Sequence, residues 1–296
     1  MNSTAGPALV DALAADVDRL RAAEPEVRRD HPDSVHKMRV ATRRLRSLLK
    51  SYRRILARPP VGELSEELRW LAGLLGVARD AEVRGVRFAE LLGENGALPD
   101  DKAAPGEKAT PRNDFGALLV AEERKRYEAA HAEAVAAFDS QRYRTLLHRL
   151  RETLADPPLR AAQADKPADE VFAEVLRRDF RDLRRLVRTE PQGGETERIE
   201  HLHEIRKAAK RLRYSAEAAT AVLGEPAALL ARRAKQLQTV LGDHRDAVEA
   251  LETLRAHAAM ADEPGYQRLC DAEQAAAAKA LERYPAAIEF LRHHAL

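Results

Sequence analysis

A short pattern of basic residues occurs twice in this chain and restricts its fold more than any other feature. The first copy runs His36-Lys37-Met38-Arg39 and continues to Arg43-Arg44-Leu45-Arg46; the second runs His203-Glu204-Ile205-Arg206 and continues to Lys210-Arg211-Leu212-Arg213. Each copy places a histidine and three basic residues at i, i+3, i+7 and i+10, which share one face of an α-helix. Each copy therefore predicts a helix that packs by its apolar side and presents a row of cations on the other.

The remaining sequence is also helical in its pattern. Alanine, leucine, arginine and glutamate dominate, and aromatic residues make up only 4%, a usage that favours an all-α fold. Between breaks rich in proline and glycine, the apolar residues recur at helical spacing. The expected helices lie near residues 8–23, 33–57, 63–92, 115–153, 168–189, 197–223, 226–258 and 265–293.

A second repeated word supports an internal duplication. Leu75-Gly76-Val77-Ala78-Arg79-Asp80-Ala81 matches Leu241-Gly242-Asp243-His244-Arg245-Asp246-Ala247, in the same order relative to the basic pattern and at nearly the same spacing. We expect one domain over residues 1–296, built from a first helical half (1–154) and a second (155–296). We favour helix packing over ligand contact for this word, because a glycine lets helices approach closely and its arginine and aspartate can pair with neighbours.

The charge of the chain is segregated. The formal net charge is only +2 although charged residues make up 33% of the chain, so any strong positive field is local. The stretch 33–58 holds nine basic residues and one acid, Asp33, and a row of cations on a helix fits a linear polyanion. The second basic row ends at Glu217, where the first carries Lys50, so we expect the second site to be shorter or weaker.

The paired basic segments, in halves separated by a long helical stretch, resemble the CHAD family, the conserved-histidine α-helical domain. The resemblance covers nearly the whole chain. It implies two four-helix bundles related by pseudo-twofold symmetry in one compact domain, with basic helices lining a central groove or pore that binds inorganic polyphosphate. The implied phosphate contacts are His36, Arg39, Arg43, Arg46 and Lys50 from the first half, and His203, Arg206, Lys210 and Arg213 from the second.

Further basic residues are candidates for additional anion contacts. A third row on one side of its helix contains Arg177, Arg181 and Arg184, although Asp179 and Asp182 lie close enough to pair with it. Arg54 and Lys207 extend the two main rows. His36 and His203 could act in catalysis, bind a metal or contact a phosphate, and we favour a phosphate contact or a structural role, because the adjacent arginines would repel a metal ion. We expect no metal and no cofactor.

Two other functions remain open at this point. Basic helices also suit nucleic acids, but aromatic residues for stacking are scarce and no reading motif is recognisable. A polyphosphate-processing enzyme would need clustered carboxylates for divalent metal, and none adjoins the basic rows. We therefore expect a module without enzymatic activity. Members of the CHAD family often accompany a triphosphate-tunnel domain, whose signature is Glu-x-Glu-x-Lys. The nearest string here, at residues 195–199, lacks the lysine, so we expect a module that stands alone.

The remaining features concern location and partners. The single cysteine, Cys270, excludes an intrachain disulfide and fits a reducing compartment. No uncharged run approaches the roughly 18 residues of a membrane span. We expect a cytoplasmic protein without membrane contact, with association to polyphosphate or storage granules and their proteins as a further option, and nucleic acid as an unfavoured partner.

Overall fold

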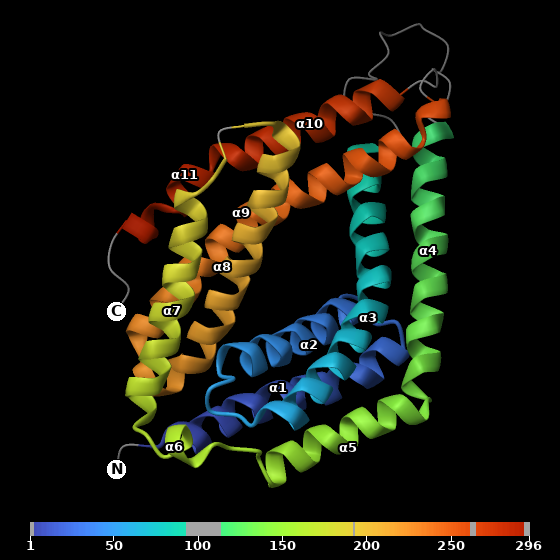
Figure 1. Cartoon of the computed structure of the whole chain (residues 1–296). Coiled ribbons are helices and arrows are strands. Elements are labelled where there is room, and N and C mark those ends of the chain that lie inside the picture. Colours follow the sequence, from blue (N-terminus) through green and yellow to red (C-terminus); the bar gives the residue numbers. More distant parts are fainter. Residues whose placement is uncertain (1–2, 93–113, 192, 261–264, 293–296) are drawn as a thin grey trace, which may run out of the picture.

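The computed structural model describes residues 3–92, 114–191, 193–260 and 265–292, which are almost entirely helical (Figure 1). The helices are α1 (Ala5–Arg28), α2 (Ser34–Ser51), α3 (Arg58–Leu92), α4 (Asp114–Phe138), α5 (Gln141–Ala155), α6 (Ala161–Ala164), α7 (Ala168–Arg188), α8 (Glu195–Leu223), α9 (Glu225–Ala256), α10 (Tyr266–Glu282) and α11 (Tyr284–Ala287), with 3-10 turns η1 (Ala258–Met260) and η2 (Glu289–Arg292). Extended pairing in this part of the chain is limited to two isolated bridges, Thr4 with Pro167 and Leu56 with Leu159. The all-α prediction is confirmed.

Three of the expected helices end well before the predicted limit or are divided in two. The helix expected over 115–153 is two helices, because the chain turns at Ser140, whose hydroxyl accepts a hydrogen bond from the Tyr143 N–H (3.2 Å) and begins α5. The helix expected over 33–57 ends at Ser51, and the following turn brings Leu56 against Leu159. The last expected helix stops at Glu282, and a short one-turn helix with a proline in its first turn follows.

Neighbouring helices pack in the same order in both halves. α1 packs on α2 and α2 on α3, just as α7 packs on α8 and α8 on α9. The main apolar core, however, is continuous through both halves and includes buried residues of α1, α2, α3, α7, α8 and α9. The division into two separate four-helix bundles is not confirmed by this shared core, and the internal duplication stays a prediction.

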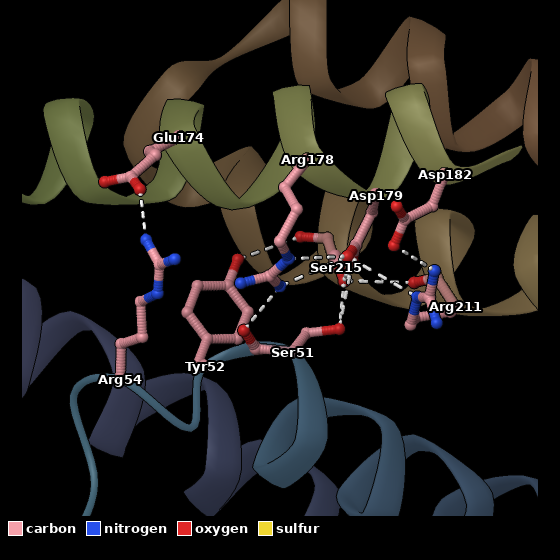
Figure 2. Close-up of polar contacts among 9 residues, drawn as sticks. All are labelled: Ser51, Tyr52, Arg54, Glu174, Arg178, Asp179, Asp182, Arg211 and Ser215. Atoms are coloured by element: carbon pink, nitrogen blue, oxygen red, sulfur yellow. Dashed lines mark hydrogen bonds and ion pairs between the residues drawn. The ribbon is translucent and has the colours of Figure 1, made fainter. Parts of the chain in front are cut away.

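The halves meet first where α2 and α7 approach α8, through the polar network drawn in Figure 2. Asp179 of α7 is only 1% exposed, and its Oδ2 accepts hydrogen bonds from the hydroxyls of Ser51 (3.0 Å) and Ser215 (2.7 Å). Its Oδ1 lies 3.1 Å from Arg178 Nη2 and 3.4 Å from Arg211 Nε. A buried carboxylate with this many partners fixes the three helices in one relative position.

The halves meet again at the far end of α3 and α9. A second apolar cluster there joins α3, α4, α9 and α10 through Phe88, Phe115, Leu254 and Leu269. Beside it the fully buried carboxylate of Glu273 accepts from Arg87, with Nε 2.6 Å from Oε1 and Nη2 2.5 Å from Oε2. Two junctions thus hold α2, α3, α8 and α9 in place, and Figure 1 shows these helices surrounding the middle of the molecule.

The described helices include none that is both long and apolar enough to span a bilayer.

We predict that Asp179→Ala destabilises the fold by about 3 kcal/mol, because it removes the counter-charge of Arg178 and the carboxylate that accepts from the buried hydroxyls of Ser51 and Ser215. Urea unfolding followed by circular dichroism measures this change. Glu174→Ala is the matched control, since Glu174 pairs with Arg54 at 2.6 Å on the exposed surface in the same view and should cost less than about 1 kcal/mol. Equal losses for the two variants would contradict the role assigned to Asp179.

Candidate functional site

Adjacent basic residues in each copy of the motif point in different directions. Arg44 Nε donates to Asp16 Oδ1 of α1 (2.7 Å), and Arg211 Nη2 donates to Asp182 Oδ2 of α7 (2.9 Å) and also lies beside Asp179. Asp16 and Asp179 are each 1% exposed. These pairs anchor each basic helix to the helix before it. Because neighbouring side chains on a helix are about 100° apart, Arg43 and Lys210 are then turned elsewhere.

Basic side chains of α2 and α8 meet in one group, which we call the inner basic cluster: Arg39, Arg43, Arg206, Lys210 and Arg213. Burial lowers the pKa of Lys210 to about 7, and the charges of Arg43, Arg206, Arg39 and Arg213 add to this effect. Burial likewise lowers the pKa of Arg43, with Arg39 and Arg206 contributing. The two predicted rows therefore face one another.

Three members of this cluster have no carboxylate at ion-pair distance among the described residues. Arg43, Arg206 and Lys210 make no ion pair there, and the Nε atoms of Arg43 and Arg206 are buried without a hydrogen-bond acceptor. Buried polar groups are normally paired, and like charges held close together raise the free energy of the fold. The cluster therefore lacks the paired negative charge that buried cations normally have beside them.

A basic cavity of about 790 Å³ adjoins the cluster and shares Arg43 and Lys210 with it. It lies between α2, the first turns of α3, the second half of α7 and α8. Its other basic lining residues are Arg46, Lys50, Arg53, Arg69, Arg185, Lys207 and Arg211. Two acids, Asp182 and Glu204, also line it, but Asp182 pairs with Arg211 and Glu204 with Lys207.

Arg46, Lys50 and Lys207, which the sequence analysis named as candidate anion contacts, line this cavity, together with residues that the motif did not reveal. Arg69 and Arg185 come from α3 and α7, whose charges are mixed along the sequence. Burial lowers the pKa of Arg46, and nearby Arg69 lowers it further. A sequence signal for Arg69 or Arg185 is missing, because their place depends on how helices far apart in the chain pack.

The two motif histidines lie outside the basic cavity. His36 lies near Arg79 and Arg43, and His203 lines a different cavity of about 1140 Å³ between α8, α9 and α10. Burial lowers the pKa of both imidazoles, with Arg79 the next cause for His36 and Lys207 for His203. Both rings are therefore mainly neutral at pH 7. In the described part of the chain, no three His, Cys, Asp or Glu side chains are grouped to hold a metal ion.

Glu217, which ends the basic row of α8, neutralises part of the charge of that row. Arg213 Nε donates to Glu217 Oε1 (2.7 Å), and Glu217 also pairs with Arg44 of the first half. Arg213 therefore contributes less free positive charge to the inner basic cluster than Arg43 does.

The remaining candidates point away from the basic cavity. Arg54 pairs with Glu174, and Arg177 lies in a shallow pocket beside Asp169, Glu170 and Glu174. Arg181 is exposed on α7, and Arg184 is half-buried with a buried Nε that lacks an acceptor among the described residues. The side of α7 that meets α8 carries Asp179, Asp182 and Arg185 instead, so the row that includes Arg177 occupies a different face.

The second repeated word lies directly against the basic rows. A Cβ added at Gly76 of α3 would lie 3.7 Å from Arg39 Nη2, and one at Gly242 of α9 would lie 3.4 Å from Arg206 Nη2. Asp80 Oδ1 accepts from Arg39 Nη1 at 2.8 Å. The aspartate of the second repeated word in the first half, Asp80, therefore pairs with an arginine of the basic motif, Arg39.

We predict that Lys210→Met stabilises the ligand-free protein at pH 7 and below. In the folded protein the pKa of Lys210 is about 7, below its ordinary value of 10.5. Between these two pH values the unfolded chain binds more protons than the folded protein. The free-energy cost of holding a charged Lys210 in the fold is therefore full below pH 7 and decreases as the pH rises above 7. Urea unfolding at pH 6 and pH 9 should show the stability gap between variant and wild type shrinking at the higher pH. A gap that is constant with pH would contradict the assignment.

Comparison with known proteins gives this arrangement a family. The family model described as CHAD domain matches residues 11–255. Two curated relatives from Mycobacterium tuberculosis, the uncharacterised proteins MT2285 (strain CDC 1551 / Oshkosh) and Rv2226 (strain H37Rv), are each 35% identical over 254 residues. The match covers 86% of this chain and 46% of each relative, so the chain spans about half the length of these relatives.

Solved structures show the same fold. PptA from Streptomyces chartreusis superposes with a TM-score of 0.76 at 21% identity, covering 96% of this chain and 99% of that one. The CHAD domain from the plant Ricinus communis superposes with a TM-score of 0.65 at 23% identity, covering 98% of this chain and 90% of that one. With the family model spanning both basic helices and this fold around them, the chain belongs to the CHAD domain family.

Proposed function

We propose that this protein binds inorganic polyphosphate through the inner basic cluster and the adjoining basic cavity, with both halves contributing. One observation carries the proposal: Arg43, Arg206 and Lys210 come from two helices far apart in the sequence, lie together, and make no ion pair with a carboxylate among the described residues. The association of the CHAD family with polyphosphate supports it. The ligand would supply the negative charge that these side chains lack.

The proposed contacts follow the two rows into the cavity. Arg39, Arg43, Arg46 and Lys50 would act from α2, and Arg206, Lys210 and Arg213 from α8, with His36 and His203 at the ends of the rows. Arginine presents forked donors to phosphate oxygens and keeps its charge, while lysine adds a mobile point charge. A linear chain of phosphates without bases needs such cations along its length and no stacking surface.

We propose that the protein binds polyphosphate without cleaving it or transferring its phosphoryl groups. The two carboxylates of the basic cavity, Asp182 and Glu204, are neutralised by Arg211 and Lys207, which does not favour the capture of Mg²⁺ that phosphoryl transfer needs. The proposed ligand would be met in the cytoplasm or at polyphosphate or storage granules, where other proteins could join the complex.

We predict that Arg43→Ala and Lys210→Ala each weaken binding of a size-defined polyphosphate by at least about tenfold, on the scale of a charge-assisted hydrogen bond. Isothermal titration calorimetry at fixed ionic strength measures the affinity. Arg54→Ala and Arg181→Ala are matched controls, because these arginines lie outside the basic cavity, and should change affinity less than about twofold.

The affinity of the wild type should also fall steeply with added salt, since binding releases counterions. Unchanged affinity in the Arg43 and Lys210 variants would contradict the proposed site. Displacement of polyphosphate by an equal charge of duplex DNA would favour the nucleic-acid alternative, and phosphate release in the presence of Mg²⁺ would favour the enzyme.

We predict that binding takes up a proton near pH 8. Lys210, with a pKa of about 7, is mostly neutral there, and a bound polyanion raises its pKa, so the complex holds more protons than the free protein. Affinity is then highest below pH 7 and falls as the pH rises. Calorimetry in buffers of different ionisation enthalpy measures the uptake. The Lys210→Arg variant keeps its charge at this pH and should bind polyphosphate without taking up a proton. The same proton uptake in that variant would exclude Lys210 as the group that is protonated.

A further inference from the structure

The two repeated words of the sequence meet side by side in the structure. α2 carries the first basic motif and packs on α3, which carries the first Leu-Gly-x-x-Arg-Asp-Ala word; α8 and α9 repeat this arrangement in the second half. Within each pair the contacts have the same register. The positive charges of Arg79 and Arg245 lower the pKa of His36 and His203, respectively. The glycine of each word lies under the arginine three residues after that histidine.

The glycines provide the space that these arginines occupy. Both Gly76 and Gly242 are buried, and the side-chain atoms nearest to an added Cβ are those of the guanidinium groups of Arg39 and Arg206. Any longer side chain at either position would fill the surface on which the guanidinium lies. Glycine weakens a helix interior, and its presence at the same place in both helices coincides with this close approach of a guanidinium group.

The aspartates lie one turn further along the same faces, since residues i and i+4 are neighbours on a helix. Asp80 Oδ1 accepts from Arg39 Nη1 at 2.8 Å. In the second half Arg206 is the strongest positive neighbour of Asp246, opposing the rise in the pKa of that carboxyl caused by burial. An arginine has five N–H donors, so one carboxylate can hold it in place and leave the others free.

We propose that these words are positioning elements of the anion site. Gly76 and Gly242 admit the guanidinium groups of Arg39 and Arg206, and Asp80 orients the guanidinium of Arg39 so that its free N–H groups face the inner basic cluster. Asp246 acts on Arg206 only as a nearby negative charge. This inference rests on the proposed polyphosphate binding. It adds residues that carry the wrong charge for a polyanion site and act there only through their arginines.

The sign of one substitution separates positioning from simple electrostatics. Asp80→Asn removes a negative charge near the cluster, which by charge alone would tighten binding of polyphosphate. If Asp80 positions Arg39, the same substitution weakens binding instead, by about tenfold for the loss of one oriented charge-assisted contact. Asp246→Asn should weaken binding to a smaller extent, because Asp246 makes no ion pair with Arg206 comparable to that of Asp80 with Arg39.

Asp243→Asn is the matched control. It makes the same change of charge on α9, but Asp243 pairs with Arg283 (2.6 Å) on the exposed surface, so binding should stay the same or tighten slightly. A double-mutant cycle adds a readout that a merely structural role would not move: in an Arg39→Ala background, Asp80→Asn should no longer weaken binding.

A second variant covers the case in which Asp80→Asn perturbs folding. Leucine is a better helix former than glycine, so Gly76→Leu should keep the helix while displacing Arg39, and should weaken binding. Circular dichroism checks that this variant is folded, because a larger side chain at a buried position costs some stability. Tighter binding in Asp80→Asn to the same degree as in Asp243→Asn, equal effects of Asp80→Asn with and without Arg39, or unchanged affinity in Gly76→Leu would each overturn this inference. A wild-type protein that does not bind polyphosphate would overturn the proposed function itself.

Discussion

Like charges repel, and the inner basic cluster persists only because the packing around it holds α2 and α8 together. The apolar core runs through both halves, and the buried network around Asp179 joins α2, α7 and α8 beside the cluster. The second junction at Glu273 holds the far ends of α3 and α9. Burial at these two junctions offsets the repulsion between the cations. The basic side chains are thereby held in place before any anion arrives.

The basic residues of the repeated motif have two different roles. Arg44 and Arg211 pair with buried or half-buried aspartates on the preceding helix and fix the rotation of the basic helix. That rotation turns Arg43 and Lys210 toward the other half, where they make no ion pair with a carboxylate among the described residues. The carboxylates thus determine which cations are neutralised and which remain available, and this distribution matters more than the net charge of +2.

A site of this kind exchanges stability for binding. The cluster destabilises the ligand-free fold, because burial and neighbouring cations disfavour the charged form of Lys210. An anion that binds only the folded state would relieve this penalty and stabilise the protein in proportion to its affinity. The same residues therefore weaken the empty protein and strengthen the proposed complex, which is the expected pattern at a functional site.

The sequence by itself determined the helices, the face on which each basic row lies, and the resemblance to the family that the comparisons confirm, because helical periodicity is a local property that a few residues reveal. It left open which of two adjacent basic residues would be neutralised, since the partners Asp16 and Asp179 lie on other helices. It also gave no sign of Arg69 and Arg185 in the cavity, or of Asp80 as the partner of Arg39. The tertiary structure decided these points, because the charge that a side chain feels depends on neighbours that the chain brings together only by folding.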